Sequence, residues 1–395
     1  MKKCEDAWMR IRGKRFDSGE PIQVEIDGNR VASCTACPER EDTADWPWIA
    51  PGLIDIQING YLGQEFCSPE LTVEKTRRVI LSYDAHGLVR CCPTVTTQSA
   101  AAMNHALRTI AKTCQTHPEI AARIAGIHVE GPFLAREDGP RGAHPREHIR
   151  PPDWDEFQRM QEAAGGRIAI LTLSPEYETT PQFIRKAVAS GVVVSLGHTA
   201  ATEDQITAAV DAGATLSTHL GNGAHANLPR HHNYIWAQLA DDRLTAELIG
   251  DGHHLPSAVF KVFVRAKTVA RCVLTSDISG LAGLPPGRYD SELCELEILP
   301  NGKLVVAGQR EVMAGASAPL GTGVVNAMRF AGLSLAESIQ MAVRNPATLL
   351  GIEPGGLEPG SLADFVLFDI ADESDPTLAP MLVRKTILGG EVVYE

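Results

Sequence analysis

The sequence predicts an α/β protein, a (β/α)8 TIM-like barrel with a small β-sandwich domain formed from both chain ends. Three observations predict this fold class. The chain has 395 residues, which suits a barrel of roughly 250 residues plus a smaller domain. Short apolar runs alternate eight times with helix-like stretches in the middle of the chain, as in barrels of parallel strands. Both ends are rich in β-type patterns, and neither end can bury a sheet face alone.

The small domain is predicted from hairpin patterns at the two ends. Ile22–Glu25 and Val31–Cys34 flank an Asp27-Gly28 turn, which predicts a hairpin near the N-terminus. Near the C-terminus, Ala363–Asp369 and Lys385–Val393 read as strands, and a Gly389-Gly390 turn breaks the second one. The simplest arrangement packs both ends together, so we expect a composite small β-sandwich from residues 1–50 and 348–395.

The barrel is predicted over residues 51–347. Its eight expected strands are the apolar runs Trp48–Ile58, Leu88–Val95, Ile124–Val129, Ile168–Leu173, Val192–Leu196, Ala214–Ser217, Ala246–Ile249 and Cys272–Leu274. Its helix-like stretches include Thr72–His86, Ala100–Cys114, Thr180–Ser190, Glu203–Ala212 and Ser257–Ala270. A further hairpin, Leu293–Val306 with an Asn301-Gly302 turn, is expected after the eighth strand, and Gly355–Ser361 marks the return to the small domain.

Composition narrows the class of protein. Hydrophobic residues make up 44% and charged residues 22% of the chain, as in ordinary globular proteins. The formal net charge of −13 makes nucleic acid and anionic membranes unlikely partners, although a local basic cluster could still hold a small anionic substrate. Nine Cys at irregular spacing indicate reduced thiols. The charged N-terminus and the lack of long apolar stretches predict no signal peptide, no transmembrane helix and a cytoplasmic location.

Polar residues gather just past the ends of the predicted strands. Because the C-terminal strand ends of a barrel meet at one face, we expect these side chains to converge. The segments concerned are Asp55-Ile56-Gln57-Ile58-Asn59-Gly60, His128-Val129-Glu130-Gly131-Pro132, Gly197-His198-Thr199, Thr218-His219-Leu220-Gly221-Asn222, Asp251-Gly252-His253-His254 and Thr275-Ser276-Asp277.

One carboxylate and two imidazoles among these residues predict a metal site. Glu130, His198 and His219 suit a divalent ion such as zinc, with room left for water, whose pKa the metal would lower toward about 7. Asp277 could accept the proton of that water and later donate it to a leaving amine. His128 lies two positions before Glu130 on the same strand face, so it is a reserve ligand or supporting group. Each residue alone could be an ordinary polar group, and only the joint pattern indicates metal.

These segments also carry a family likeness. The chain resembles the amidohydrolase superfamily, and within it the N-acetylglucosamine-6-phosphate deacetylase family, over nearly its whole length. The likeness rests on the ordered combination of Pro51-Gly52-Leu53-Ile54-Asp55, His128-Val129-Glu130-Gly131-Pro132-Phe133, Gly197-His198-Thr199-Ala200-Ala201-Thr202, Thr218-His219-Leu220 with Asn222, Asp251-Gly252-His253-His254, Asn345-Pro346-Ala347 and Ser361-Leu362-Ala363-Asp364.

The resemblance implies a reaction and a ligand set. It implies hydrolysis of the N-acetyl amide of an amino sugar phosphate, most simply N-acetylglucosamine 6-phosphate, by a homodimer. One divalent ion per subunit, zinc or else Fe²⁺, Mn²⁺ or Co²⁺, would be bound by Glu130, His198 and His219, with Asp277 as the general acid and base. Gln57 and Asn59 stand where many relatives have a His-x-His pair, and no Lys ends the fourth strand, so a second metal is not expected.

The resemblance also implies substrate contacts. Asn222 and the backbone of Gly223 would touch the sugar or the phosphate, His254 would lie against the sugar, and His144 would contact the substrate near its carbonyl. Arg230 stands at the spacing from His219 where the family has a phosphate-binding Arg, whose fork suits a phosphate dianion. A solvated loop is the alternative for Arg230.

Departures from the family pattern lie in the substrate loops. Gly221, the run from Arg230 to Trp236 and the segment from Ser276 to Gly280 all differ from the usual residues. A different N-acylated amine or a cyclic amide therefore stays open as substrate. A non-catalytic scaffold is the remaining alternative, and it would lack stoichiometric metal.

Overall fold

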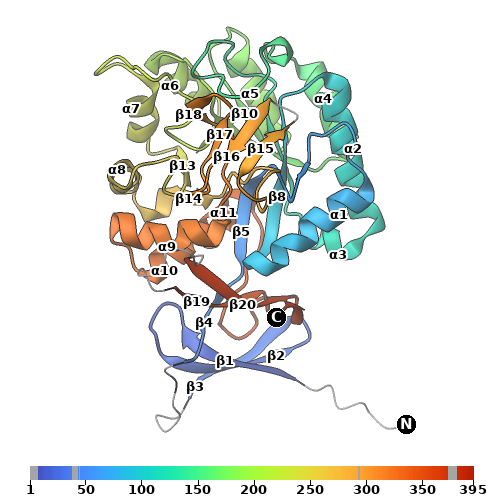
Figure 1. Cartoon of the computed structure of the whole chain (residues 1–395), viewed down its shortest axis with the longest axis vertical. Helices are drawn as coiled ribbons and strands as arrows, with labels where there is room; N and C mark the ends of the chain where they lie inside the picture. The colour runs from blue at the N-terminus through green and yellow to red at the C-terminus, as the bar shows by residue number, and fades with distance from the viewer. Residues whose placement is uncertain (1–7, 38–42, 44, 292–293, 372–379) are drawn as a thin grey trace.

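The computed structural model describes residues 8–37, 43, 45–291, 294–371 and 380–395. Its centre is a sheet of eight parallel strands in the order β14-β13-β12-β11-β10-β9-β8-β5 (Figure 1). The two end strands approach each other where the Asn59 amide donates to the Ile278 carbonyl at 2.8 Å. The predicted barrel is therefore confirmed as a nearly closed one. Its strands are β5 (Leu53–Ile58), β8 (Leu88–Thr96), β9 (Ile127–Glu130), β10 (Ile168–Leu173), β11 (Val193–Leu196), β12 (Leu216–Ser217), β13 (Thr245–Ile249) and β14 (Cys272–Thr275).

Helices surround this sheet (Figure 1), and their side-chain caps explain where several of them begin. Ser99 caps the second helix, and Thr202 and Ser334 each form a capping box with the residue three positions on, Gln205 and Glu337. The helices are α1 (Val73–Ser82), α2 (Ala100–Thr116), α3 (Pro118–Ala121), α4 (Trp154–Ala163), α5 (Thr180–Ala189), α6 (Glu203–Asp211), α7 (Tyr234–Ala240), α8 (Ser257–Lys267), α9 (Leu320–Ala331), α10 (Leu335–Ala342) and α11 (Arg344–Leu350), with 3-10 turns η1 (Tyr83–His86), η2 (Arg146–His148) and η3 (Val269–Arg271). Among the described residues, no helix combines the length and apolarity needed to cross a membrane.

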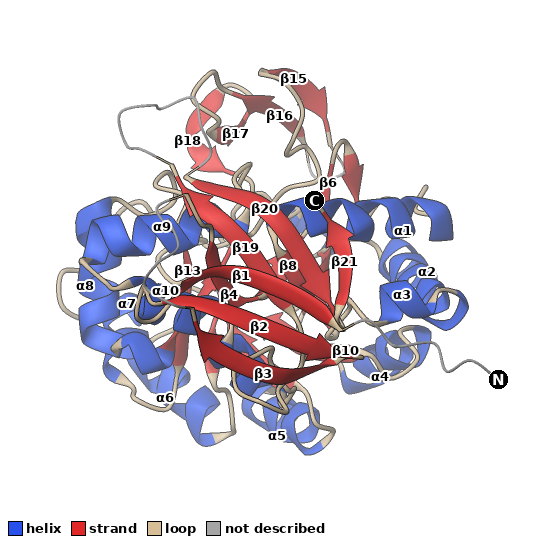
Figure 2. Cartoon of the chain, turned by 90° about the horizontal axis from the view of Figure 1, so that it is seen from below, coloured by secondary structure: helices blue, strands red, loops and turns tan. Residues whose placement is uncertain are grey.

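The small domain combines strands from both ends of the chain, as predicted. Seven strands form one hydrogen-bonded sheet in the order β21-β20-β19-β4-β1-β2-β3 (Figure 2). Buried side chains from both halves of this sheet, such as Val24, Ile49 and Phe365, share one core. The strands are β1 (Met9–Arg15), β2 (Pro21–Asp27), β3 (Arg30–Ala36), β4 (Trp48–Pro51), β19 (Phe365–Ile370), β20 (Met381–Leu388) and β21 (Glu391–Tyr394).

The apolar run Trp48–Ile58, predicted as one barrel strand, is two strands in two different sheets. Residues 48–51 form β4 of the small domain, and residues 53–58 form β5 of the barrel. The chain passes from one sheet to the other at Gly52, whose amide donates to the Asp364 carbonyl at 2.9 Å. A Cβ atom at Gly52 would lie 2.2 Å from the Val89 side chain. Both strands are buried, so hydrophobicity alone could not reveal the boundary between them.

A four-stranded antiparallel sheet follows the eighth barrel strand. It contains β15 (Gly287–Asp290), β16 (Glu295–Ile298), β17 (Leu304–Val306) and β18 (Gln309–Met313), while a separate two-stranded ribbon pairs β6 (Gly60–Tyr61) with β7 (Gln64–Glu65). The predicted hairpin Leu293–Val306 corresponds to β16 and β17, although Leu293 lies outside the described residues. Leu281, Leu296, Ile298 and Leu304 give the inserted sheet its own apolar core. The insertion is therefore a packed element rather than a loose loop.

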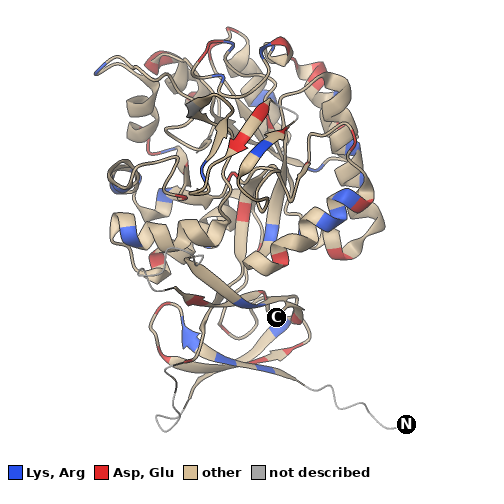
Figure 3. Ribbon diagram, viewed as in Figure 1, with Lys and Arg blue, Asp and Glu red and all other residues tan. Residues whose placement is uncertain are grey.

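A buried ion pair supports the packing of the barrel beside the small domain. The Arg123 guanidinium donates to both carboxylate oxygens of Asp84, at 2.8 and 2.7 Å, and both residues are 6% exposed. The Asp84 carbonyl in turn accepts from the Thr386 hydroxyl on β20. Charged residues of both signs are otherwise interspersed along the outer helices and the small domain (Figure 3).

We expect Arg123→Met to lower the free energy of unfolding by about 3–5 kcal/mol, because Asp84 would stay buried without its counter-charge. Urea denaturation of the purified variant measures this loss. The double variant Arg123→Met with Asp84→Leu should recover most of the stability. A single variant as stable as the parent would show that the pair is not needed.

Candidate metal centre

Four titratable side chains stand at the carboxyl ends of barrel strands. Glu130 is the last residue of β9, and His198, His219 and Asp277 each come two residues after the end of β11, β12 and β14. The last three have positive φ angles of 50°, 29° and 50°, in a chain with only five such non-glycine residues among those described. Strained backbone of this kind is concentrated at functional sites. All four side chains line one pocket.

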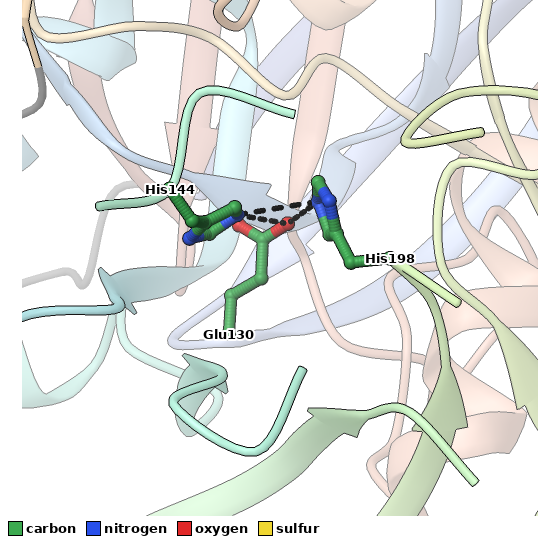
Figure 4. A group of neighbouring side chains, drawn as sticks. All are labelled: Glu130, His144 and His198. Atoms are coloured by element: carbon green, nitrogen blue, oxygen red, sulfur yellow. Dashed lines mark hydrogen bonds and ion pairs between the residues drawn. The ribbon is translucent and has the colours of Figure 1, made fainter. Parts of the chain in front are cut away.

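The side-chain nitrogens and one carboxylate oxygen converge on a small space. Glu130 Oε1 lies 3.0 Å from His198 Nε2 and 3.1 Å from His219 Nε2, and those two nitrogens are 3.1 Å apart. His144 Nε2, from the loop after β9, lies 3.2 Å from His198 Nε2 and 3.7 Å from Glu130 Oε1 (Figure 4). All four residues are buried. The structure therefore brings the three predicted ligands together and adds His144 beside them.

These distances fit a divalent metal ion better than a hydrogen-bonded network. His198 Nε2 faces two other imidazole nitrogens at 3.1–3.2 Å, and it cannot form a hydrogen bond to both of them with a single proton. Ligand atoms about 2 Å from one tetrahedral ion would lie roughly 3.3 Å apart, close to these distances. Glu130 and His198 could bind an ion together with a third ligand, and either His144 or His219 is close enough to be that ligand. The group with His219 has the shorter distances, so its members are the stronger candidate ligands.

Burial and mutual contact perturb the titration of these groups. Burial raises the pKa of Glu130, but hydrogen bonds from the surrounding imidazoles outweigh it and hold the pKa well below its usual range. Burial and a neighbouring imidazole lower the pKa of His198 to about 4. Burial lowers the pKa of His219, yet the hydrogen bond to Glu130 prevails and raises it to about 9. Burial and the charge of Glu130 raise the pKa of Asp277 to about 6.

Two amide side chains at the carboxyl end of β5, Gln57 within the strand and Asn59 just after it, hold the carboxylates in place. Gln57 Nε2 donates to Glu130 Oε2 at 3.1 Å and to Asp277 Oδ1 at 3.0 Å. Asn59 Nδ2 donates to the same Asp277 oxygen at 2.8 Å. Gln57 and Asn59 thus orient the two carboxylates through hydrogen bonds, and Asp277 Oδ2 lies outside this set of bonds.

His128, the reserve ligand expected from the sequence, is not brought into the cluster. Its Nδ1 lies 3.1 Å from the Ile56 carbonyl and its Nε2 lies 2.7 Å from Thr172 Oγ1. Both ring nitrogens are therefore engaged within the barrel, and burial lowers the pKa of His128 to about 4. Strand alternation places His128 on the same face of β9 as Glu130. His128 comes two residues earlier on the strand, however, so its ring contacts Thr172 and not the ligand cluster.

The cluster opens into a pocket of about 470 Å³, a size suited to a small molecule. Eight of the nine site residues predicted from the sequence line it: Glu130, His144, His198, His219, Asn222, Gly223, His254 and Asp277. Gly223 comes so close to the His198 ring that an added Cβ atom would lie 2.7 Å from Nδ1. His254 is oriented by Asp251, whose Oδ2 lies 2.7 Å from its Nδ1.

Arg230, the ninth predicted residue, is exposed and is not among the residues that line the pocket. The pocket instead receives Lys303 from the turn between β16 and β17, and it is the sole Lys or Arg in the described lining. His225 also lines it, and its Nε2 lies 3.0 Å from Glu137 Oε1 of the loop that carries His144. The sequence held no signal for Lys303, because the approach of Lys303 to the pocket depends on how the inserted sheet packs over the barrel.

The chain matches a known family and several characterised proteins over most of its length. The amidohydrolase family profile matches residues 48–393. The N-acetylglucosamine-6-phosphate deacetylase of Bos taurus is 33% identical, covering 99% of this chain and 92% of the bovine protein. The N-acetylgalactosamine-6-phosphate deacetylase of Escherichia coli O157:H7 is 32% identical, covering 88% of this chain and 90% of that protein.

Solved structures of similar proteins share the whole architecture. A mutant N-acetyl-D-glucosamine-6-phosphate deacetylase of Mycobacterium smegmatis, in complex with N-acetyl-D-glucosamine-6-phosphate, aligns with a TM-score of 0.86 and 28% identity, over 98% of this chain and all of that one. The N-acetylglucosamine-6-phosphate deacetylase of Thermotoga maritima aligns with a TM-score of 0.83 and 25% identity, over 98% of this chain and 99% of the other.

Proposed function

This chain belongs to the amidohydrolase family, and on that premise we propose that it hydrolyses the N-acetyl amide of N-acetylglucosamine 6-phosphate, releasing glucosamine 6-phosphate and acetate. The observation that carries the proposal is the approach of Glu130, His198 and His219 to within about 3 Å of one another, with Asp277 in the same pocket. A full-length relative that is 33% identical carries that deacetylase name.

We propose that Glu130, His198 and His219 hold one divalent metal ion. A carboxylate and two imidazoles suit zinc, and Fe²⁺, Mn²⁺ and Co²⁺ accept the same ligands. Bound there, the ion would supply Lewis acidity toward the acetyl carbonyl and lower the pKa of water. Metal analysis of the purified protein tests its identity. A homodimer and a cytoplasmic location complete the proposal and stay predictions.

Asp277 is the proposed general acid and base. Its raised pKa of about 6 leaves it deprotonated at neutral pH and close enough to neutrality to return a proton. Gln57 and Asn59 hold its Oδ1, so Oδ2 is the oxygen that takes the proton from the attacking water. Asp277 then delivers that proton to the amine nitrogen as the carbon–nitrogen bond breaks, and acetate leaves with the water oxygen.

Other pocket residues are proposed to bind and orient the substrate. His144 lies beside the ligand cluster, where its ring can donate a hydrogen bond to the acetyl carbonyl oxygen. Asn222, the Gly223 backbone and His254 line the same pocket and are proposed to contact the sugar. The phosphate needs a cation, and either Arg230 from the sequence pattern or Lys303 from the pocket lining could provide it.

The test of the function is acetate release from N-acetylglucosamine 6-phosphate, compared with its unphosphorylated form and with N-acetylgalactosamine 6-phosphate. The galacto substrate is included because the Escherichia coli relative carries that name. We expect kcat/KM for the phosphorylated glucosamine derivative to exceed that of the unphosphorylated sugar by about 100-fold, the effect of one or two charge-assisted hydrogen bonds. No preference for phosphate would favour another N-acylated amine or a cyclic amide.

Two matched variants identify the phosphate contact. We expect Lys303→Met to raise KM for the phosphorylated substrate by about 10-fold, because a charge-assisted hydrogen bond is lost, with little change for the unphosphorylated sugar. Arg230→Met is the comparison, since Arg230 is exposed outside the pocket lining. A larger loss for Arg230→Met than for Lys303→Met would assign the phosphate to Arg230 instead.

A further inference from the structure

Glu247 is a buried carboxyl group that the proposed reaction does not use. It stands in the middle of β13, inside the barrel, and is 0% exposed. The backbone amide of His219 donates to Glu247 Oε2 at 3.4 Å, and the amide of Leu220 donates to the Glu247 carbonyl at 2.8 Å. Glu247 is therefore a second carboxyl group beside the candidate ligand His219, and it comes from the neighbouring strand.

Two polar atoms in this contact are buried without a hydrogen-bond partner in the described part of the chain. They are Nδ1 of His219 and Oε1 of Glu247. The other histidine ligand differs, because His198 Nδ1 lies 2.8 Å from the Pro140 carbonyl, which accepts its proton. Buried polar atoms without partners are uncommon and costly, so two such atoms on adjoining residues point to a hydrogen bond made in another state of the site.

Metal binding supplies that state. His219 Nε2 faces Glu130 and His198, so Nε2 is the nitrogen that would bind the ion. A neutral imidazole ring has one N–H proton, so when Nε2 binds the ion this proton must be on Nδ1. Histidines that bind metals usually donate their second nitrogen to a carboxylate or a carbonyl, which fixes the tautomer and the orientation of the ring.

We propose that Glu247 is a positioning residue that accepts this hydrogen bond through Oε1 and thereby orients His219 for metal binding. The inference rests on the proposed metal site but reaches a residue outside it. An apolar side chain of the same length would remove the unpaired carboxyl oxygen, but it would also leave the His219 amide without its acceptor, Glu247 Oε2. Glu247 should therefore matter for metal affinity through Oε1, in addition to the long contact that Oε2 makes in the metal-free chain.

The experiment compares Glu247→Gln, which keeps an acceptor oxygen, with Glu247→Met, which keeps only the length. We expect Met to weaken zinc binding by about 10–100-fold in a chelator competition, the usual effect of losing such a partner. Glutamine should stay within about threefold of the parent. The thermal unfolding temperature of the metal-free chain should fall by a similar amount in the two variants, because each gives up the carboxylate oxygen that accepts from the His219 amide, and KM at saturating zinc should be unchanged.

Leu248→Met is the matched control, because Leu248 is the next residue of β13 and packs in the main core. It should leave zinc affinity unchanged. Parental zinc affinity in Glu247→Met, or an equal loss of zinc affinity in Glu247→Gln, would each overturn the positioning role. A parent protein that binds no zinc would instead count against the proposed metal site itself, so the two failures are distinguishable.

Discussion

Replacing Asp277 by Asn is expected to lower kcat by about 10²–10⁴-fold, the usual contribution of a general acid or base. Asn has nearly the same shape and can keep the hydrogen bonds that Gln57 and Asn59 make at this position, but it cannot accept or return a proton. Steady-state acetate release measures the effect. Zinc content and KM of the variant should match the parent, because Asp277 is not among the proposed ligands.

The acid side of the pH profile should report the same residue. Burial and the charge of Glu130 raise the pKa of Asp277 to about 6, so the carboxylate is populated above that pH and lost below it. Because a bound divalent ion would lower this pKa, we expect kcat/KM of the parent to fall at a pH below about 6. The residual activity of Asp277→Asn should lack this step. Near-parental turnover in that variant would remove Asp277 from the mechanism.

Replacing His198 by Asn should have the second large effect, a loss of zinc affinity of more than about 100-fold together with nearly all activity. His198 touches both other candidate ligands, at 3.0 and 3.1 Å, so its removal leaves only two of the three proposed ligands. Zinc content after gel filtration and acetate release measure the two losses. A strong chelator should inactivate the parent in the same way, and added zinc should restore it.

His232→Asn is the matched control for that change, because the His232 side chain is 89% exposed on the surface. It should keep both zinc and activity. Bound zinc should also stabilise the parent against heat by about 2.7 kcal/mol at a hundredfold excess over its dissociation constant, and this gain should vanish in His198→Asn. Stoichiometric zinc in His198→Asn would contradict the proposed ligand set.

Most of the barrel could be predicted from the sequence because hydrophobic runs and turn residues are local signals. The expected run Ile168–Leu173 is β10 to the residue, and the stretch Thr72–His86 contains α1 and η1. The same signal failed at Trp48–Ile58, since two consecutive buried strands in different sheets look like one long strand. Only the packing of Gly52 against Val89 and its hydrogen bond to Asp364 separate them.

The candidate site was predictable to the same extent and for a related reason. Glu130, His198, His219 and Asp277 follow strands, and the barrel topology alone requires strand ends to share one face. Arg230 and Lys303 mark the limit. Arg230 has the spacing typical of a phosphate-binding residue but is exposed, whereas Lys303 belongs to no motif and yet lines the pocket. The sequence could not show this, because the geometry of loops and insertions is not periodic.

The sequence by itself determined the (β/α)8 class, the composite small domain and the donor atoms available at the barrel mouth, since each follows from residue type and from short-range periodicity. Only the tertiary structure decided which of these donors approach within 3.1 Å, that Gln57 and Asn59 hold Asp277, and that Glu247 lies beside His219. Such contacts join residues up to 220 positions apart. Their distances depend on strand register and barrel closure, which no local pattern in the chain records.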